Sequence, residues 1–294
     1  MPSASTTSSL SFLWLEITGR CQLRCEHCYA DSGPWGTHGR MSELDWRRVL
    51  DEAADLGVRT VQFIGGEPTL HPALATLVCH AVDRGIEVEV FSNLVRVPSR
   101  LWEVFKDAGV SLATSYYSPK AAEHDAITGH RSHDRTLVGI RRALELGIPL
   151  RVGVISVRGD QDLEGAVTEL RALGVQDVGV DRLRQVGRGV RDRRPAVDQL
   201  CGSCTQGSLA VSPTGAVWPC PFARWLEIGD VRRSSLAEVH LGETAARVRR
   251  ELEREFRRLH VVACQPHCAP NLPAPQTCKP ISCEPKRPRR GLSQ

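Results

Sequence analysis

Three cysteines fall within the stretch Cys21-Gln-Leu-Arg-Cys25-Glu-His-Cys28-Tyr29, which directly follows the apolar run Phe12–Thr18. The apolar run predicts a strand, and the spacing C-x3-C-x2-C lets one loop bring three sulfur atoms to one point. A structural zinc site takes four protein ligands, so a set of three suits a 4Fe–4S cluster that keeps one iron for a ligand from outside the protein. On these cysteines alone, a zinc-binding loop and a disulfide-bonded loop remain open as alternatives.

A second motif follows the next predicted strand. The apolar run Val61–Ile64 leads directly into Gly65-Gly66-Glu67-Pro68. Glycines allow a ligand to approach the backbone closely, and the adjacent carboxylate suits a cationic amine. The two motifs together favour a cluster with an amine-bearing ligand over a zinc loop.

Cys25-Glu-His27-Cys28-Tyr29 and Gly65-Gly-Glu-Pro-Thr-Leu-His71-Pro72 resemble the motifs of the radical S-adenosylmethionine (SAM) superfamily. The resemblance implies that Cys21, Cys25 and Cys28 hold a [4Fe–4S] cluster and that SAM chelates its fourth iron. It also implies that one electron from an external reductant cleaves SAM to methionine and a 5′-deoxyadenosyl radical, which abstracts a hydrogen atom from the substrate. The hard chemistry then belongs to the cofactor, and the protein holds and orients it.

The same resemblance implies a set of SAM-contacting residues: Tyr29, Gly65, Gly66, Glu67, Pro68, Ser92, Asn93 and Ser115. Gly65–Glu67 would receive the methionine amino group, so Gly66→Val is expected to weaken SAM binding with little loss of iron. An arginine often follows the His124-Asp125 pair in this family. Here Thr128 occupies that place and Arg131 is the nearest arginine, so this ligand is not assigned. Asn93 and Ser115 also fit the alternative of turn or cap residues.

Strands and helices are expected to alternate six times before the chain changes in character. Strands are expected at 12–18, 61–64, 86–91, 110–116, 149–157 and 175–183, and helices at 42–57, 72–84, 101–108, 134–146 and 162–173. This alternation predicts an α/β fold with a parallel sheet and helices outside it. Six units are too few for an eight-fold barrel, and the resemblance implies an open, partial (β/α)6 TIM-type barrel.

A second set of cysteines follows a basic stretch at 188–195, which is expected to be a linker. Cys204, Gly215 and Cys220 reproduce C-x10-G-x4-C and resemble the SPASM extension, a small, loop-rich domain that carries auxiliary [4Fe–4S] clusters in many radical SAM enzymes. The resemblance implies one or two auxiliary clusters held by Cys201, Cys204, Cys220, Cys264, Cys268, Cys278 and Cys283. Seven thiolates cannot fill two cubanes, so one iron is open or takes another ligand such as His267, or only one cluster forms. A zinc site in the tail is the alternative.

These predictions divide the chain into a radical SAM partial barrel at 1–190, a SPASM-like domain at 200–285 and a basic, disordered tail at 286–294. The helix expected at 243–260 carries Val248, Leu252 and Phe256 on one face, which predicts that this face packs on the rest of the protein. Cys79 lies on a predicted outer helix, and a buried, inert thiol is expected there.

Composition and charge narrow the class of protein. The sequence is 41% hydrophobic and 24% charged, which is typical of a globular protein. The formal net charge of +4 is too small to predict a nucleic-acid partner. No signal peptide or transmembrane span is recognised, so no membrane partner is expected. Eleven cysteines without an export signal indicate metal or redox chemistry in a reducing compartment, the cytoplasm.

Three functional hypotheses remain at this point. The first is an oxidoreductase that cross-links or otherwise oxidises a residue of a ribosomally made peptide, the most common use of the SPASM extension. The second is a radical SAM dehydrogenase or epimerase of a small carbohydrate-like metabolite. The third is a cluster- or zinc-binding module without catalysis, which the amine-binding loop at 65–68 disfavours. About eleven residues precede the first strand, so a peptide-modifying enzyme would use a separate leader-binding protein or read the leader on its own surfaces.

Overall fold

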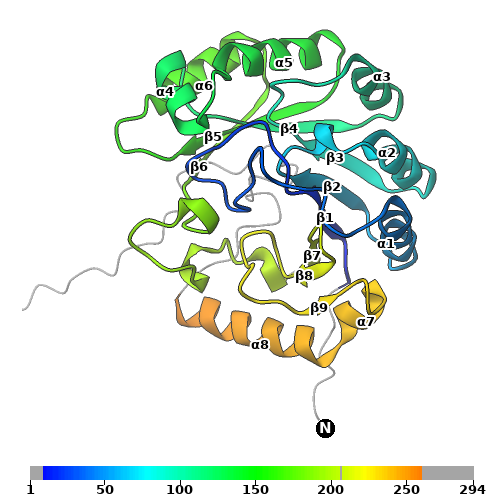
Figure 1. Cartoon of the computed structure of the whole chain (residues 1–294). Coiled ribbons are helices and arrows are strands. Elements are labelled where there is room, and N and C mark those ends of the chain that lie inside the picture. The colour runs from blue at the N-terminus through cyan, green and yellow to red at the C-terminus, as the bar shows by residue number, and fades with distance from the viewer. Residues whose placement is uncertain (1–8, 206, 260–294) are drawn as a thin grey trace, which may run out of the picture.

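Parallel strands with helices packed against them form the framework of this molecule (Figure 1). The structure is a computed structural model that describes residues 9–205 and 207–259. The elements of the first part are β1 (Phe12–Thr18), α1 (Glu43–Asp55), β2 (Thr60–Gly65), α2 (Leu74–Asp83), β3 (Glu87–Phe91), α3 (Ser99–Asp107), β4 (Ser111–Tyr116), α4 (Ala121–Thr128), α5 (His133–Glu145), β5 (Leu150–Ser156), α6 (Leu163–Ala172) and β6 (Asp177–Arg182). The second part contains β7 (Ser208–Val211), β8 (Ala216–Trp218), β9 (Gly229–Asp230), α7 (Leu236–Leu241) and α8 (Glu243–Arg258).

The strands form one nine-stranded sheet in the order β6-β5-β4-β3-β2-β1-β7-β8-β9. The pairs from β1 to β6 are all parallel, as the alternation of strands and helices predicts. Helices α1 to α6 cover the outer side of this part (Figure 1). All seven residues of β1 are buried, which is typical of a parallel strand covered on both faces. The expected α/β partial barrel is therefore confirmed.

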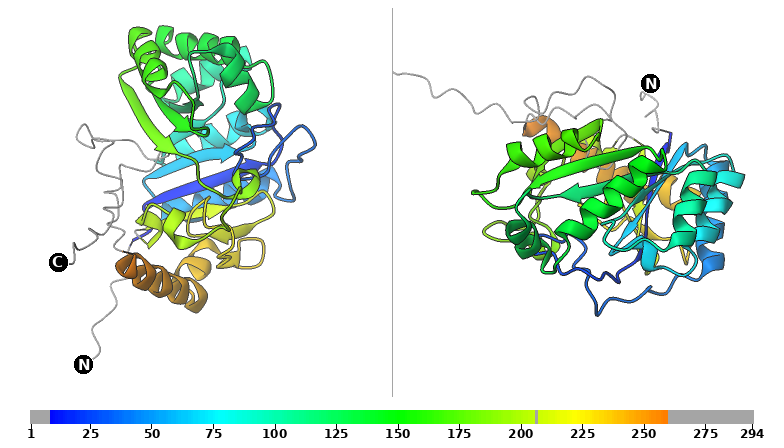
Figure 2. Two further views of the ribbon diagram at one scale, coloured as in Figure 1. Left: turned by 90° about the vertical axis from the view of Figure 1, so that its left-hand side faces the viewer. Right: turned by 90° about the horizontal axis from the view of Figure 1, so that it is seen from above.

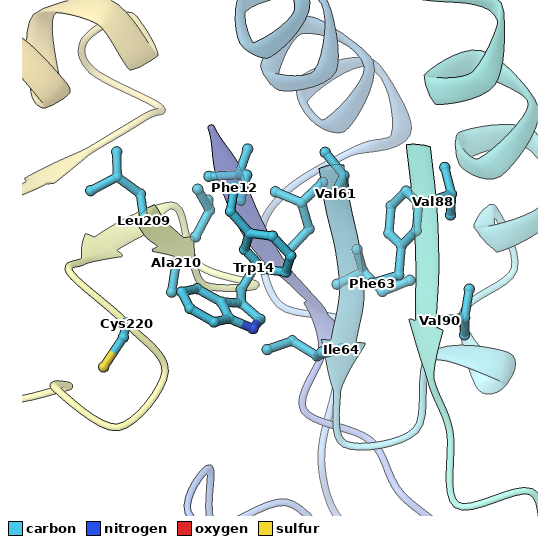
Figure 3. Close-up of a cluster of buried hydrophobic side chains, with 14 of the residues drawn as sticks. Phe12, Trp14, Val61, Phe63, Ile64, Val88, Val90, Leu209, Ala210 and Cys220 are labelled. Carbon is cyan, nitrogen blue, oxygen red and sulfur yellow. The ribbon is translucent and has the colours of Figure 1, made fainter. Parts of the chain in front are cut away.

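The sheet continues beyond the six expected strands into the second part of the chain. Strand β7 pairs with β1 in parallel, from Phe12 opposite Ser208 to Leu15 opposite Val211. Strands β8 and β9 then extend the sheet in antiparallel fashion. Figure 3 shows Leu209 and Ala210 of β7 beside Phe12 and Trp14 of β1. The two parts therefore share one sheet and one core, which the sequence does not predict.

Helices α7 and α8 close the end of the molecule opposite α4, α5 and α6 (Figure 2). Val248, Leu252 and Phe256 of α8 are buried, which confirms the expected apolar face. They belong to the same buried apolar cluster as the side chains of β1 to β5. Because this core is continuous, the second part is packed onto the first and not merely tethered to it.

Two helix starts follow directly from local sequence. Ser42 caps α1, and its hydroxyl accepts a hydrogen bond from the Asp45 N–H at 3.2 Å. Asp45 returns a contact to the Ser42 N–H at 2.8 Å, which completes a capping box. Asp162 caps α6 through the Gly165 N–H at 2.9 Å. Both helix boundaries lie within two residues of the expected ones.

Two expectations need correction, and two others lie outside the described part of the chain. Helix α4 is present although no helix is expected there. Cys79 is exposed, because α2 turns Leu77, Val78 and Ala81 towards the core. The tail at 286–294 and four expected ligands lie outside the described residues: Cys264, Cys268, Cys278 and Cys283. Within 9–205 and 207–259, no helix combines the length and apolar character that crossing a membrane requires.

Candidate radical SAM site

A cavity of about 170 Å³ lies at the carboxyl ends of the parallel strands, where ligands bind in sheets of this kind. The three cysteines of the first motif all line it. It is also lined by five of the eight residues expected to contact SAM: Tyr29, Gly65, Gly66, Asn93 and Ser115. Glu67, Pro68 and Ser92 are not among its lining residues. The structure therefore brings together most, but not all, of the sequence-predicted site.

The cysteine loop presents three free thiols to this cavity. Cys21 is buried, and Cys25 and Cys28 are partly buried. The Leu23 N–H points at the Cys21 sulfur at 3.4 Å, and the Ser32 N–H at the Cys28 sulfur at 3.3 Å. Burial, reinforced by the nearby Glu67 carboxyl, raises the pKa of the Cys21 thiol to about 12. Cysteine binds iron as the thiolate, so iron binding must displace protons from this loop.

Backbone contacts fix the loop in place. Its start pairs with Gly33 through a hydrogen bond of 3.0 Å from the Cys21 N–H. Its middle is tied to the last turn of α4, where Thr128 and Ile127 accept from the N–H groups of Arg24 and Glu26, each at 3.0 Å. These carbonyls belong to a helix end, whose oxygens lack partners inside the helix. Helix α4 thus serves as the dock for the cysteine loop.

The two glycines of the second motif line the cavity and also lie against backbone atoms of the protein. A Cβ on Gly66 would lie 2.3 Å from the Arg20 carbonyl oxygen, and one on Gly65 would lie 2.3 Å from the Thr18 carbonyl oxygen. Gly65 also has φ +145°, a conformation that side chains disfavour. The glycines let β2 pass close to the backbone that leads into Cys21. The expectation that a larger side chain at 66 would spare the iron is therefore revised.

Glu67 is fully buried and has both carboxylate oxygens engaged by the protein. One oxygen accepts from the Thr69 N–H at 3.0 Å, the Thr69 hydroxyl at 2.7 Å and the Ser92 hydroxyl at 2.8 Å. The other accepts from the Asn93 N–H at 2.8 Å. Burial raises the pKa of Glu67, and these donors oppose that shift. Glu67 and Ser92 therefore hold the end of β3, and Pro68 begins the short 3-10 turn Pro68–Leu70 that follows Glu67. Contact of these three residues with SAM stays a prediction.

Asn93 faces the cysteine loop from the end of β3. Its amide nitrogen donates towards the Cys21 sulfur at 3.6 Å, and its amide oxygen accepts from Gln22 at 2.9 Å. Thr128 lines the cavity, whereas Arg131 is exposed and does not. The described structure thus gives no support to Arg131 as the missing arginine.

Aromatic residues that the sequence argument did not select form one wall of the cavity. His27 Nε2 and the Tyr117 hydroxyl share a hydrogen bond of 3.1 Å, and His124 packs edge-on to Tyr117 at 5.2 Å between ring centres. Burial lowers the pKa of His27 and of His124 to about 4, so both rings are neutral at physiological pH. The Nδ1 atoms of His27 and His124 are buried and have no hydrogen-bond partner among the described residues.

Another wall of the cavity comes from the end of β6, the stretch that follows it and the turn after β8. Asp181, Arg184, Arg188 and Phe222 line the cavity there. Arg188 belongs to the expected linker, but it contacts the cysteine loop directly, as Gly187–Gly189 forms a short 3-10 turn against that loop. Composition identified this stretch as basic. Its contacts with the cysteine loop could not be predicted, because contacts between residues far apart in the chain leave no local sequence pattern.

The second cysteine set lies close to this wall. Cys201 is partly buried, Cys204 and Cys220 are buried, and the sulfur atoms of Cys204 and Cys220 are 3.2 Å apart. Burial raises the pKa of Cys201. Two residues beyond Cys220, Phe222 packs against Tyr29 with 5.1 Å between ring centres. The two cysteine sets are therefore linked through side chains that line one cavity.

The donor set fits a cluster that retains an open position. Three free thiols face one cavity, and among the described residues no three or more His, Cys, Asp or Glu side chains are arranged to hold a single metal ion. A cubane spaces its ligands more widely than a single ion does. The remaining lining groups include an amide, neutral imidazoles, aromatic rings and the charged side chains of Asp181, Arg182, Arg184 and Arg188, and they suit an organic ligand with polar groups beside it.

The fold and the site define an α/β-barrel protein with an iron–sulfur centre at the mouth of its sheet. The chain belongs to the radical SAM superfamily, whose sequence model matches residues 15–170, more than half of its length. An iron–sulfur cluster-binding domain model matches residues 201–269. Its cofactors are accordingly SAM and [4Fe–4S] iron–sulfur centres.

Known proteins with similar sequences and folds agree with this assignment. The PqqA peptide cyclase of Streptomyces rochei is 28% identical over 275 residues, which cover 76% of this chain and 74% of that protein. Streptococcus suis SuiB bound to the precursor peptide SuiA superposes with a TM-score of 0.70 at 15% identity, over 83% of this chain and 67% of that one. The protein anSMEcpe with bound AdoMet gives a TM-score of 0.64 at 11% identity, over 81% and 82%.

Proposed function

We propose that this protein is a radical SAM oxidoreductase that cross-links or dehydrogenates residues of a ribosomally made peptide. The observation that carries the proposal is the cavity that runs from Cys21, Cys25 and Cys28 to Phe222, beside the second cysteine set. A substrate held there lies between two groups of thiols. The similarity to PqqA peptide cyclases supports a peptide over a small carbohydrate-like metabolite.

In this proposal the first cysteine set holds the SAM-binding cluster, and the other lining residues hold SAM. When bound, the reduced cluster and SAM supply a 5′-deoxyadenosyl radical that removes a hydrogen atom from the substrate. Asn93, Ser115 and the backbone at Gly65–Gly66 line the ligand's side of the cavity. The neutral imidazoles of His27 and His124 offer buried hydrogen-bonding atoms, and Tyr29 and Tyr117 exclude water.

The second cysteine set has a separate role in the proposal. A substrate that has lost a hydrogen atom would complete its oxidation by losing one electron and one proton, and an auxiliary cluster bound by this set would accept the electron. Cys201, Cys204 and Cys220 lie where they can serve it, with the cysteines of the tail as further ligands. Residues 1–190 then form the catalytic unit and residues 200–285 the auxiliary unit. The proposal also includes an external one-electron reductant, a cytoplasmic setting and a separate leader-binding protein.

The test uses anaerobically reconstituted full-length protein, SAM, dithionite and a candidate precursor peptide translated from a short reading frame sought beside the gene. The expected product is a peptide that lacks two hydrogen atoms, formed with one 5′-deoxyadenosine per modification. A Cys21/Cys25/Cys28→Ala variant should form neither product and should keep the iron of the second set.

Two results would overturn the proposal in different ways. Undiminished 5′-deoxyadenosine formation in the triple variant would remove the assignment of the three cysteines. Cleavage of SAM with an unchanged peptide, together with oxidation or epimerisation of a hydroxylated small metabolite, would establish the carbohydrate alternative instead.

A further inference from the structure

Arg188 contacts the cysteine loop on both sides of Cys28, although it lies 163 residues beyond Cys25 in the sequence. Its Nε donates to the Cys25 carbonyl at 3.0 Å, and its backbone N–H donates to the Cys28 carbonyl at 3.0 Å. Its two terminal nitrogens donate to the Asp31 carboxylate at 2.7 Å and to the Ser32 carbonyl at 2.5 Å. One residue thus joins four points of the loop.

The turn that Arg188 holds is the one that orients the Cys28 sulfur. Asp31 has φ +52°, in the left-handed region that residues other than glycine seldom adopt. The Asp31 N–H bonds to the Cys28 carbonyl at 3.3 Å, and the Ser32 N–H reaches the Cys28 sulfur at 3.3 Å. The Arg188 guanidinium binds the side chain of Asp31 and the carbonyl of Ser32, so it stabilises this strained turn directly.

Neighbouring residues are adapted to this contact. Gly187 has φ +59°, and a Cβ there would lie 2.4 Å from the Tyr29 carbonyl oxygen and 2.5 Å from that of Cys28. The glycine therefore allows the chain at Arg188 to reach the loop backbone. The guanidinium also lies over the Trp35 ring, 5.7 Å from its centre. The Arg188 side chain is 21% exposed, so these interactions are partly shielded from water.

The other parts of the cysteine loop are held by different elements. Cys21 is positioned by Gly33 and Asn93, and the segment around Arg24 and Glu26 is docked on α4. The link between Cys25 and Cys28 is short and has only one internal backbone hydrogen bond, from the Cys28 N–H to the Cys25 carbonyl at 3.3 Å. Arg188 binds the carbonyls of both cysteines and so sets their separation.

We propose that Arg188 is a positioning residue that holds Cys25 and Cys28 at cluster-binding separation and places a positive charge beside the cluster. This inference rests on the proposed cluster site and not on the identity of the substrate. Iron–sulfur clusters become more negative on reduction, and nearby charge and hydrogen bonds set their potentials. The guanidinium charge should therefore favour the reduced cluster.

The test compares three variants of the full-length reconstituted protein: Arg188→Gln, Arg188→Lys and Arg191→Gln. Arg191 is the matched control because its 46%-exposed side chain pairs with Glu26 of the same loop at 3.4 Å but touches no cysteine carbonyl. The signal of the first cluster is defined as the iron and the EPR signal that the Cys21/Cys25/Cys28→Ala variant lacks. Its loss to a chelator and its midpoint potential are then measured without substrate.

Arg188→Gln should lose this iron about tenfold faster, because charge-assisted hydrogen bonds are removed, and its cluster should have a more negative potential. Arg188→Lys should also lose iron faster, because an ammonium group cannot span the same acceptors, but it should keep the wild-type potential. Arg191→Gln should match the wild type in both measurements.

Wild-type iron retention in both Arg188 variants would overturn the positioning role. A potential in Arg188→Lys that differs from the wild-type value, or one in Arg188→Gln that equals it, would overturn the charge effect. If Arg188→Gln retains no cluster, the positioning role stands and Arg188→Lys decides the charge effect. Because none of these measurements uses a peptide, they are independent of the proposed reaction.

Discussion

At the scale of single residues, the motif at 65–68 stabilises the fold in addition to its expected contact with SAM. Glu67 binds Thr69, Ser92 and Asn93 with its two oxygens, and Gly66 lies against the Arg20 carbonyl. The motif therefore joins the ends of β1, β2 and β3 beneath the cavity. A substitution in this motif should displace the cysteine loop first and should weaken SAM binding as a consequence.

Gly66→Ala tests this order of effects. The new Cβ would lie 2.3 Å from the Arg20 carbonyl oxygen and 2.6 Å from its carbon, so the backbone that leads into Cys21 must move. We expect a loss of about 1–3 kcal/mol in the free energy of unfolding, as for other overpacked sites, together with reduced iron at the first cysteine set. Urea unfolding and iron analysis measure the two effects.

Gly179→Ala is the control, since a Cβ on Gly179 meets nothing within 4 Å. It should change neither stability nor iron content appreciably. Full iron in Gly66→Ala, with only SAM binding weakened, would show that the glycine serves the ligand alone.

At the scale of elements, α4 supports the cysteine loop. Its carbonyls at Ile127 and Thr128 bind the cysteine loop, and its Asp125 side chain binds two amides at the start of the next helix. Asp125 Oδ1 accepts from the N–H groups of Ser132 at 2.8 Å and His133 at 2.9 Å, at the start of α5. Although burial acts to raise the pKa of Asp125, these donors lower it overall, which fits a carboxylate that caps a helix while ionised.

Asp125→Ala should remove the acceptor of the Ser132 and His133 N–H groups at the start of α5 and loosen the junction between α4 and α5. Losing a capping carboxylate costs about 1–2 kcal/mol, and we expect a loss of that size in the free energy of unfolding. Asp107→Ala, at an exposed position of α3, should stay within about 0.5 kcal/mol of the wild type. Equal stabilities of the two variants in urea unfolding would contradict the capping role.

At the scale of the whole molecule, the two parts of the chain are joined through β1. The edge of β1 that does not pair with β2 pairs with β7. The buried Glu16 of β1 also pairs with Arg224, which follows β8. The guanidinium contacts both carboxylate oxygens at 2.6 and 2.8 Å and lies over the Trp218 ring at 4.2 Å. Glu16 is 1% exposed, and burial raises its pKa even with this partner present.

Arg224→Met should leave a carboxylate buried without a counter-charge. Breaking a buried pair from one side costs about 3–5 kcal/mol, and we expect a loss near that range. The double variant Glu16→Gln/Arg224→Met should recover part of this loss, since no unpaired charge remains. Arg233→Met, whose side chain is 87% exposed, is the control and should be nearly neutral. Additive losses in the double variant would contradict the coupling.

Much of the fold and the centre of the site follow from local sequence alone. Apolar runs such as Phe12–Thr18 and Val61–Ile64 determined the parallel strands, and Ser42 and Asp162 determined two helix starts. The cysteine spacing determined the loop whose three thiols meet one cavity. These features depend on neighbours within a few residues, so their pattern is visible in the sequence.

Only the tertiary structure decided the features that depend on distant contacts. The pairing of β7 with β1 and the contacts of Arg188 with Cys25 and Cys28 join residues with no common periodicity or spacing. Glu67 could be recognised as part of a motif, but its partners Ser92 and Asn93 come from the next strand. Burial decides which polar groups face the ligand and which face each other, and burial is a property of the assembled chain.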